Sequence, residues 1–242
     1  MPETREHRSA FLTARWSHLF LATYAVPDRL LSPRLPPGLE LDRRDGKCFV
    51  SLVAFDFLDT RVKGIPWPGF RNFPEINLRY YVRHGERRGV VFVREFVPQR
   101  LVAWLARKLY NEPYLAVPMK SLVVDTPDHV TIDHHLEFGG RTNVIQATGA
   151  KEAFTPARET IEHFFKEHEW GFGTTHSGKL LCYRVEHPVW AVYRVTSWKI
   201  DLDWAAVYGP EWSLLQDATP DSTVIAVGSE VAVYPGVHVA EG

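Results

Sequence analysis

The sequence predicts an α+β fold, in which two or three helices pack on one curved, predominantly antiparallel β-sheet or partial barrel. Segments with strand character dominate the 242 residues, and most of them are joined by short turns. Aromatic residues make up 13% of the chain, and such large flat side chains suit a core or pocket between strands. The length fits one β-rich domain over residues 1–242, with an ordered core from about 15 to 235.

The individual elements follow from apolar runs bounded by turn residues. The expected strands are 16–26, 47–58, 75–83, 89–97, 114–124, 129–138, 141–150, 179–185, 189–202 and 223–234. The expected helices are 27–35, 99–110, 155–168 and a short one at 210–216. Asp45-Gly46 and Gly139-Gly140 are two-residue hairpin signals, and the proline-rich stretch 63–74 predicts a structured loop.

The charge balance excludes some classes of partner. The net charge is −1 and the pI is about 6.8, so neither nucleic acid nor an anionic membrane is expected as a partner. Residues 61–108 nevertheless contain eleven Lys or Arg against three Glu. This local excess indicates either a solvated basic face or a pocket that favours anionic ligands.

The cysteines and the N-terminal sequence indicate a cytoplasmic protein. Cys48 and Cys182 are far apart in apolar runs, which is typical of buried thiols in a reducing compartment. The first ten residues have no apolar stretch of signal-peptide type, and no run approaches the roughly 18 apolar residues of a membrane helix.

Neither a metal nor a cofactor is expected. His134 and His135 are neighbours on one strand and point to opposite faces, and His163 and His168 are five apart, which misses the helical spacing of a zinc motif. The sequence contains no glycine-rich phosphate loop and no nucleophile elbow.

The strand expected at 75–83 has two different faces, because successive side chains alternate. One face is apolar and is expected in the core: Ile76, Leu78, Tyr80 and Val82. The other is wholly polar: Glu75, Asn77, Arg79, Tyr81 and Arg83. The polar row is a solvent face in the simpler interpretation; the alternative is the wall of a polar cavity, against which the aromatic side chains of the preceding loop would pack.

The helix expected at 99–110 ends with the basic pair Arg107-Lys108. A lysine that lies near another cation, or is desolvated, has a lowered pKa and becomes a usable amine nucleophile. Basic residues at a helix C-terminus are also what the helix dipole favours, so the pair has a purely structural explanation as well.

Several of these segments resemble a known family. The phrases PPGLELD (36–42), FPEINLRYYVRHG (73–85), ARKLYNEPY (106–114) and HPVW (187–190) are similar to the uncharacterised YqjF-like branch of the acetoacetate decarboxylase-like superfamily. The resemblance covers residues 16–234 and implies the same fold, which is sheet-dominated around a cavity. The decarboxylases assemble into larger particles, so the resemblance also implies a possible homo-oligomer.

The resemblance also implies roles for particular residues. In the decarboxylases a pair of lysines stands at the helix end, and one of them forms a Schiff base with the β-keto acid. The matching pair here is Arg107-Lys108. This register places Arg107, which stays protonated, at the nucleophile position, whereas a shift of one residue would place Lys108 there. Glu75 matches the glutamate of the decarboxylase pocket, and Arg15 falls near the arginine that binds the substrate carboxylate.

The sequence therefore predicts a pocket that binds a small organic acid or carbonyl compound, with an anion expected. Arg107, Arg79 and Arg15 would contact the anion, and Glu75 would act as acid, base or hydrogen-bond acceptor. Tyr81 and Asn77 would complete the polar wall. If the protein is an enzyme, the expected activity is that of a decarboxylase-like lyase with Lys108 as nucleophile. The alternative is a non-catalytic ligand sensor or a structural oligomer subunit.

Overall fold

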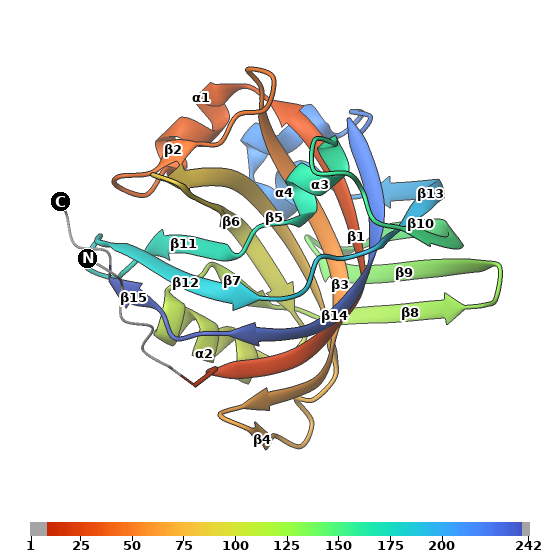
Figure 1. The fold of residues 1–242 in the computed structure, drawn as a ribbon, viewed down its shortest axis with the longest axis horizontal. Helices are drawn as coiled ribbons and strands as arrows, with labels where there is room; N and C mark the ends of the chain where they lie inside the picture. Colours follow the sequence, from red (N-terminus) through yellow and green to blue (C-terminus); the bar gives the residue numbers. More distant parts are fainter. Residues whose placement is uncertain (1–8, 239–242) are drawn as a thin grey trace.

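The computed structural model describes residues 9–238, which form one strongly curved 15-stranded sheet with four short helices (Figure 1). The strands are β1 Leu12–Val26, β2 Glu40–Leu41, β3 Cys48–Val62, β4 Ile65–Pro66, β5 Phe73–His84, β6 Arg87–Val97, β7 Tyr114–Ala116, β8 Met119–Asp125, β9 His129–Phe138, β10 Arg141–Phe154, β11 Trp170–Thr174, β12 Leu180–Glu186, β13 Val192–Asp201, β14 Ser222–Val233 and β15 Val237–His238. The α-helices are α1 Asp28–Leu31, α2 Arg100–Tyr110, α3 Ile161–Lys166 and α4 Trp204–Tyr208, and two 3₁₀ turns cover η1 Ser32–Arg34 and η2 Pro210–Leu215.

The sheet closes on itself through one pairing. Its order is β15-β12-β11-β6-β5-β3-β1-β14-β13-β10-β9-β8, and β12 also pairs with β14. The strands β12, β11, β6, β5, β3, β1 and β14 therefore form a closed ring, and β13, β10, β9 and β8 continue the sheet beyond it. Neighbours pair antiparallel except at β11–β6 and β6–β7, which are parallel. The predicted fold class is confirmed: the molecule is sheet-dominated, mostly antiparallel and curved, with few helices.

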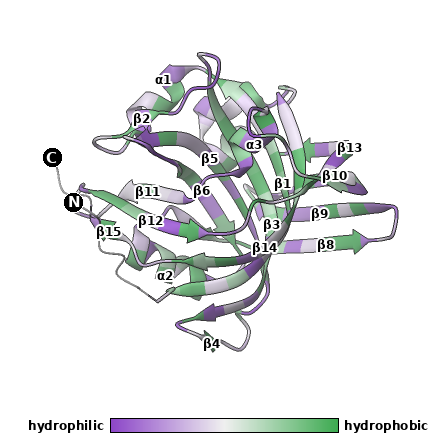
Figure 2. Ribbon diagram, in the orientation of Figure 1, coloured by the Kyte–Doolittle hydropathy of each residue, from purple (hydrophilic) through white to green (hydrophobic). Residues whose placement is uncertain are grey.

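The main core lies on the side of β5 that the sequence predicted. Ile76, Leu78, Tyr80 and Val82 are fully buried in the largest hydrophobic cluster, together with apolar residues of β1, β3 and β9. Trp204 and Trp212, from α4 and η2, close this cluster from one side. Figure 2 shows hydrophobic residues along the central strands, interrupted by hydrophilic ones, as expected for strands whose faces differ.

The helix α2 stands next to the ring and ends sharply. Asn111 adopts a left-handed conformation (φ 52°), and its backbone N–H donates to the carbonyl oxygen of Arg107. Asparagine tolerates this conformation better than most residues, and the following Pro113 cannot continue a helix. The chain therefore turns directly into β7, which places Glu112 and Tyr114 beside β6.

Three local predictions differ from the structure. The helix expected from Thr155 begins at Ile161, because Thr160, whose side chain accepts from the backbone N–H of His163, is the N-cap. The strand expected at 114–124 is interrupted by Pro118, which has no N–H to donate, and becomes β7 and β8. The strand β11 and the helix α4 were not predicted. In residues 9–238, no helix combines the length and apolar character needed to cross a membrane.

Candidate functional site

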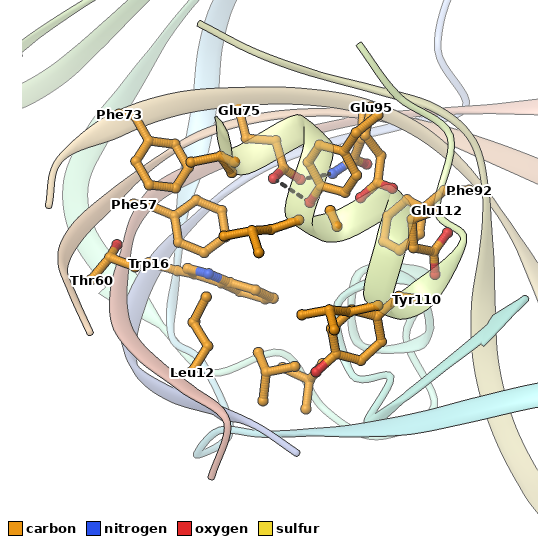
Figure 3. Close-up of a pocket in the computed structure, with 18 of the residues that line it drawn as sticks. Leu12, Trp16, Phe57, Thr60, Phe73, Glu75, Phe92, Glu95, Tyr110 and Glu112 are labelled. Carbon is orange, nitrogen blue, oxygen red and sulfur yellow. Dashed lines mark hydrogen bonds between the residues drawn. The ribbon is translucent and has the colours of Figure 1, made fainter. Parts of the chain in front are cut away.

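A pocket lies inside the closed ring of strands. Residues of β1, β3, β5, β6, β12 and β14 line it, and α2 contributes one wall. Most of the lining is apolar or aromatic; Figure 3 shows Leu12, Trp16, Phe57, Phe73, Phe92 and Tyr110 around the space. The cavity measures about 170 Å³. An apolar cavity of about 150 Å³ is large enough to hold benzene, so this one fits a ligand of similar size.

Three glutamates form the polar part of the pocket. Glu75 comes from β5, Glu95 from β6, and Glu112 from the turn after α2. Their exposed fractions are 3%, 1% and 5%. In Figure 3 they follow one edge of the pocket, and Leu12 and Trp16 are on the other side. Such deep burial of three carboxyl groups is rare unless each has partners or carries a proton.

Two of the three glutamates have defined hydrogen-bond partners. The side-chain amide of Asn77 donates to Oε1 of Glu75 over 2.9 Å, and the hydroxyl of Tyr114 donates to Oε2 over 2.8 Å. The hydroxyl of Tyr183 donates to Oε1 of Glu112 over 2.9 Å. By contrast, Oε2 of Glu95 is buried without a partner among the described residues. A side-chain hydrogen bond with Tyr114 also acts on Glu95, so the unpaired atom of this residue is Oε2.

Burial raises the pKa of all three carboxyl groups. Desolvation is the largest cause at Glu75, where it raises the pKa to about 7 against the opposing effects of Asn77, Tyr114 and Arg79. Desolvation also raises the pKa of Glu112 to about 8, and the nearby charge of Glu75 adds to the effect. For Glu95, desolvation and then the charges of its two acidic neighbours hold the pKa well above its ordinary range. At neutral pH the pocket therefore keeps protons on some of its acids.

Arg79 is the cation of the described pocket lining. One of its terminal nitrogens donates to the backbone oxygen of Phe165 over 3.0 Å, and its Nε is buried without a partner among the described residues. One guanidinium thus shares the described lining with three carboxyl groups, and its charge lowers the pKa of Glu75. The pocket is consequently not a cluster of positive charge.

The structure brings together three of the site residues expected from the sequence. Glu75, Asn77 and Arg79 all line the pocket, so this part of the polar row on β5 is a cavity wall rather than a solvent face. Tyr81 is buried outside the pocket lining, with its hydroxyl bonded to the hydroxyl of Ser51 and 3.4 Å from the backbone oxygen of Phe165. Arg83 is exposed and pairs with Glu40.

The other expected residues lie away from the pocket. Arg107 and Lys108 are exposed on α2, and neither belongs to the pocket lining. The ammonium group of Lys108 lies 4.9 Å from the ring centroid of Trp104, which is itself 48% exposed. Arg15 is also exposed and outside the lining. The helix-dipole explanation of the basic pair is therefore sufficient for its position.

Sequence reasoning missed Glu95, Glu112, Tyr114 and Tyr183. The signal for Glu95 was available, because it interrupts the apolar run of β6 and an isolated acid in such a run calls for a partner. Glu112 and Tyr114 stand in a segment read as a helix stop. Their position depends on the return of the chain alongside β6, and Tyr183 reaches them from a distant strand.

The acidic cluster does not have the arrangement of a metal site. Among residues 9–238, no group of three or more His, Cys, Asp or Glu side chains is placed to hold a metal ion. The chemistry that the arrangement itself offers is hydrogen bonding and proton transfer to a small molecule.

The chain is similar in sequence to a known protein family. The model of the DUF2071 family, described as an uncharacterized conserved protein, matches residues 13–230. The uncharacterized protein YqjF of Bacillus subtilis (strain 168) is 29% identical over 180 residues, which is 72% of this chain and 72% of that protein.

Three solved structures with a similar fold are described as enzymes. An acetoacetate decarboxylase-like enzyme from Sphingomonas wittichii RW1 superposes with a TM-score of 0.66 at 12% identity, over 97% of this chain and 95% of that one. Acetoacetate decarboxylase from Legionella pneumophila (subsp. pneumophila, strain Philadelphia 1) gives 0.66 at 17% identity, over 99% and 92%. The enduracididine biosynthesis enzyme MppR complexed with pyruvate gives 0.66 at 12%, over 98% and 93%. These likenesses establish the acetoacetate decarboxylase-like fold.

Proposed function

We propose that this chain, which belongs to the DUF2071 family, binds a small organic acid or carbonyl compound in the pocket inside its ring of strands. Glu75 would act there as acid, base or hydrogen-bond acceptor. The observation that carries the proposal is the combination of an apolar cavity of about 170 Å³ with three buried carboxyl groups at one edge. Concave, mostly apolar sites with a few converging polar groups are the usual form of small-molecule sites.

Glu75 is suited to proton transfer. Its pKa of about 7 lies near physiological pH, where a carboxyl group can both give and accept a proton. Its side chain is fixed by two hydrogen bonds, from Asn77 and from Tyr114, so its orientation toward the cavity is set before a ligand arrives. These features support Glu75 as the residue that does chemistry, if the pocket catalyses a reaction.

Anionic ligands would depend on Arg79. Arg107 and Arg15, the other arginines considered for this role, are exposed and outside the lining. Lys108, the candidate amine nucleophile, is equally remote, and the described lining contains no lysine. The proposal therefore uses no Schiff base. MppR, which has a similar fold, holds the small acid pyruvate, and this supports a ligand of that size without transferring MppR's chemistry.

We also propose a cytoplasmic location. Cys48 and Cys182 are both free and buried, which supports a reducing compartment such as the cytoplasm.

The outermost strand of the extended sheet, β8, exposes Leu122 (62%) and Val124 (44%). Apolar side chains on an unpaired edge support assembly into a homo-oligomer.

The test is to fill the pocket. Ala106 lines the cavity, and Arg107, the next residue on α2, is exposed outside it. Ala106→Phe and Arg107→Phe therefore place the same ring inside and outside the pocket. We expect acetophenone and benzoic acid to bind the parent protein and the Arg107→Phe variant, and Ala106→Phe to weaken binding at least tenfold, measured by isothermal titration calorimetry. Equal binding to both variants would place the ligand elsewhere.

The variant Glu75→Gln distinguishes a Glu75 that contacts the ligand from a Glu75 that only stabilises the fold. If Glu75 serves the ligand, this nearly isosteric variant should stay folded and change the affinity or turnover of the ligand. A structural oligomer subunit would show the opposite behaviour, because removing one member of a buried polar network costs on the order of 3–5 kcal/mol of stability. A clear loss of stability, with unchanged affinity of the folded variant for the ligand, would contradict the proposal.

A further inference from the structure

We propose that the polar edge of the pocket recognises an uncharged carbonyl group that also carries an N–H or O–H, as in a carboxamide or an undissociated carboxylic acid. Glu95 would donate to the carbonyl oxygen, and Asn77 would accept from the N–H or O–H. This inference rests on the proposed function above and narrows its ligand class.

The starting observation is a pair of unpartnered atoms at the same place. Oε2 of Glu95 and Oδ1 of Asn77 are both buried without a hydrogen-bond partner among the described residues. Both residues line the pocket, with exposed fractions of 1% and 3%. They are directly opposite each other on β6 and β5, so their side chains leave the sheet on the same face with Cβ atoms roughly 5 Å apart. Buried polar atoms are nearly always paired, so two unpaired atoms on neighbouring residues of a cavity wall point to a ligand that reaches them.

The two residues offer different hydrogen-bonding roles. Asn77 already gives its amide N–H to Glu75, which leaves its carbonyl oxygen as an acceptor. Glu95 is buried next to Glu75 and Glu112, and both desolvation and these neighbours keep its pKa well above the ordinary range. A carboxyl group that keeps its proton has one O–H to donate. The pocket thus presents one donor beside one acceptor.

A carboxamide matches this pair. Its carbonyl oxygen accepts one hydrogen bond, and its N–H donates another in the same plane, a short distance away. An undissociated carboxylic acid has the same pattern with O–H in place of N–H. A ketone satisfies the donor Glu95 and leaves Asn77 unpaired, which forfeits part of the binding free energy.

Charged ligands fit less well. A carboxylate would come to rest beside three buried acids, and the nearest cation, Arg79, already gives one nitrogen to the backbone oxygen of Phe165. An ammonium group would meet the O–H donors of protonated acids and could pair only after they release protons. The rest of the pocket, including Trp16, Phe57 and Phe73, suits the apolar body of a benzene-sized molecule (Figure 3).

Four probes of nearly equal shape test the inference in calorimetric titrations at pH 7. Benzamide has the donor and the acceptor, acetophenone only the acceptor, benzoate is an anion, and benzylammonium is a cation. We expect benzamide to bind most tightly, about tenfold more tightly than acetophenone, and both to bind more tightly than either ion. Tighter binding of benzoate or benzylammonium than of benzamide would overturn the inference, and so would equal binding of benzamide and acetophenone. In each of these cases the proposal that the pocket binds a small molecule would still hold. Binding of none of the four would overturn the proposed function as well.

Two variants of Glu95 test whether its side chain donates a hydrogen bond to the ligand. Glu95→Gln keeps an N–H donor at the same place and should leave benzamide binding within a few-fold of the parent protein. Glu95→Leu keeps the volume but has no donor, and it should weaken benzamide and acetophenone about tenfold each. Oε2 of Glu95 has no partner among the described residues, and burying a carboxyl group is costly, so the Leu variant should fold; its melting curve checks that. An unchanged affinity in Glu95→Leu would show that Glu95 does not contact the ligand.

Discussion

Replacing Glu112 with glutamine should change how the stability of the protein depends on pH. Glu112 is 5% exposed and accepts a hydrogen bond from Tyr183 at Oε1. Its pKa is raised from 4.5 to about 8, chiefly by desolvation and then by the charge of Glu75. Glutamine has nearly the same shape, can still accept from Tyr183, and does not titrate. The substitution therefore removes the proton equilibrium and leaves most of the packing.

The sign of the effect follows from proton counts. Between pH 4.5 and about 8 the unfolded chain has lost the Glu112 proton while the folded protein still holds it. The folded state then binds more protons, so the free energy of unfolding falls as pH rises, by about 1.4 kcal/mol per pH unit for one carboxyl group. Across this window the total reaches roughly 4–5 kcal/mol. Relative to the parent protein, Glu112→Gln should thus gain stability steadily from pH 5 to pH 8. Loss of a neighbouring acid also lowers the pKa of Glu95, which adds to the gain in the same direction.

The assay is urea unfolding followed by tryptophan fluorescence at pH 5, 6, 7 and 8. The quantity to compare is the difference in unfolding free energy between variant and parent at each pH, since any packing cost of the new amide is constant and cancels from the slope. Glu86→Gln is the matched control, because Glu86 is exposed on the turn between β5 and β6 and its substitution should change stability by less than about 0.5 kcal/mol throughout. A Glu112→Gln difference that stays flat from pH 5 to pH 8 would refute the raised pKa, and with it the account of a proton-holding pocket.

Two other predictions concern the walls of the pocket and the exposed lysine. A methyl group at Gly171 of β11 would collide with the ring of Tyr183, so Gly171→Ala should break the Tyr183–Glu112 hydrogen bond and lower the free energy of unfolding in urea by about 1–3 kcal/mol. Gly173→Ala on the same strand is the control, because its added Cβ would lie 3.7 Å from Glu112 Oε1, and it should cost less. Equal costs for the two variants would contradict the steric argument. Lys108 lies on the exposed face of α2 over Trp104, so it should not form a Schiff base with a ligand bound in the pocket. After incubation of the parent protein and Lys108→Ala with pyruvate and cyanoborohydride, intact-mass spectrometry should find no adduct that depends on Lys108. A single adduct that is lost in the variant would show that the amine reaches a bound carbonyl.

The sequence predicted the fold well because its signals are local. Alternation along β5 identified both its core face and its polar face, and Gly139-Gly140 marked the hairpin of β9 and β10. Asp45-Gly46 makes a turn spanned by an isolated bridge between Arg44 and Lys47, but β2, which precedes it, pairs with β5 and not with β3. Where local signals conflicted, prediction was less accurate: Thr155-Pro156 has the features of a helix start, but the helix begins only after Thr160. The closure of the ring by β12 and β14 joins segments about 50 residues apart, and no local pattern encodes it.

The candidate site was only half predictable for the same reason. Glu75, Asn77 and Arg79 share one strand, so their common face could be read from a period of two. Glu95 and Glu112 join them through the β5–β6 pairing and through the return of the chain after α2, which are tertiary facts. Arg107-Lys108 shows the converse case, in which a sequence match is preserved at a helix end but the side chains face away from the cavity.

The electrostatics of the pocket also bear on which chemistry this version of the fold can perform. An amine nucleophile must lose its proton near neutral pH, and neighbouring cations or desolvation favour that loss. The neighbours here are carboxyl groups, which favour the protonated amine whenever they are ionised. A lysine introduced at Leu105 or Ala106 would share the pocket lining with Glu75, Glu95 and Glu112, and the ionised forms of these acids would raise its pKa rather than lower it. Desolvation, and then the charges of neighbouring acids, raises the pKa of Glu95 and Glu112, so these acids favour their protonated forms at neutral pH. The acidic lining of this pocket is therefore consistent with the proton-transfer role proposed for Glu75 and not with a Schiff-base lysine.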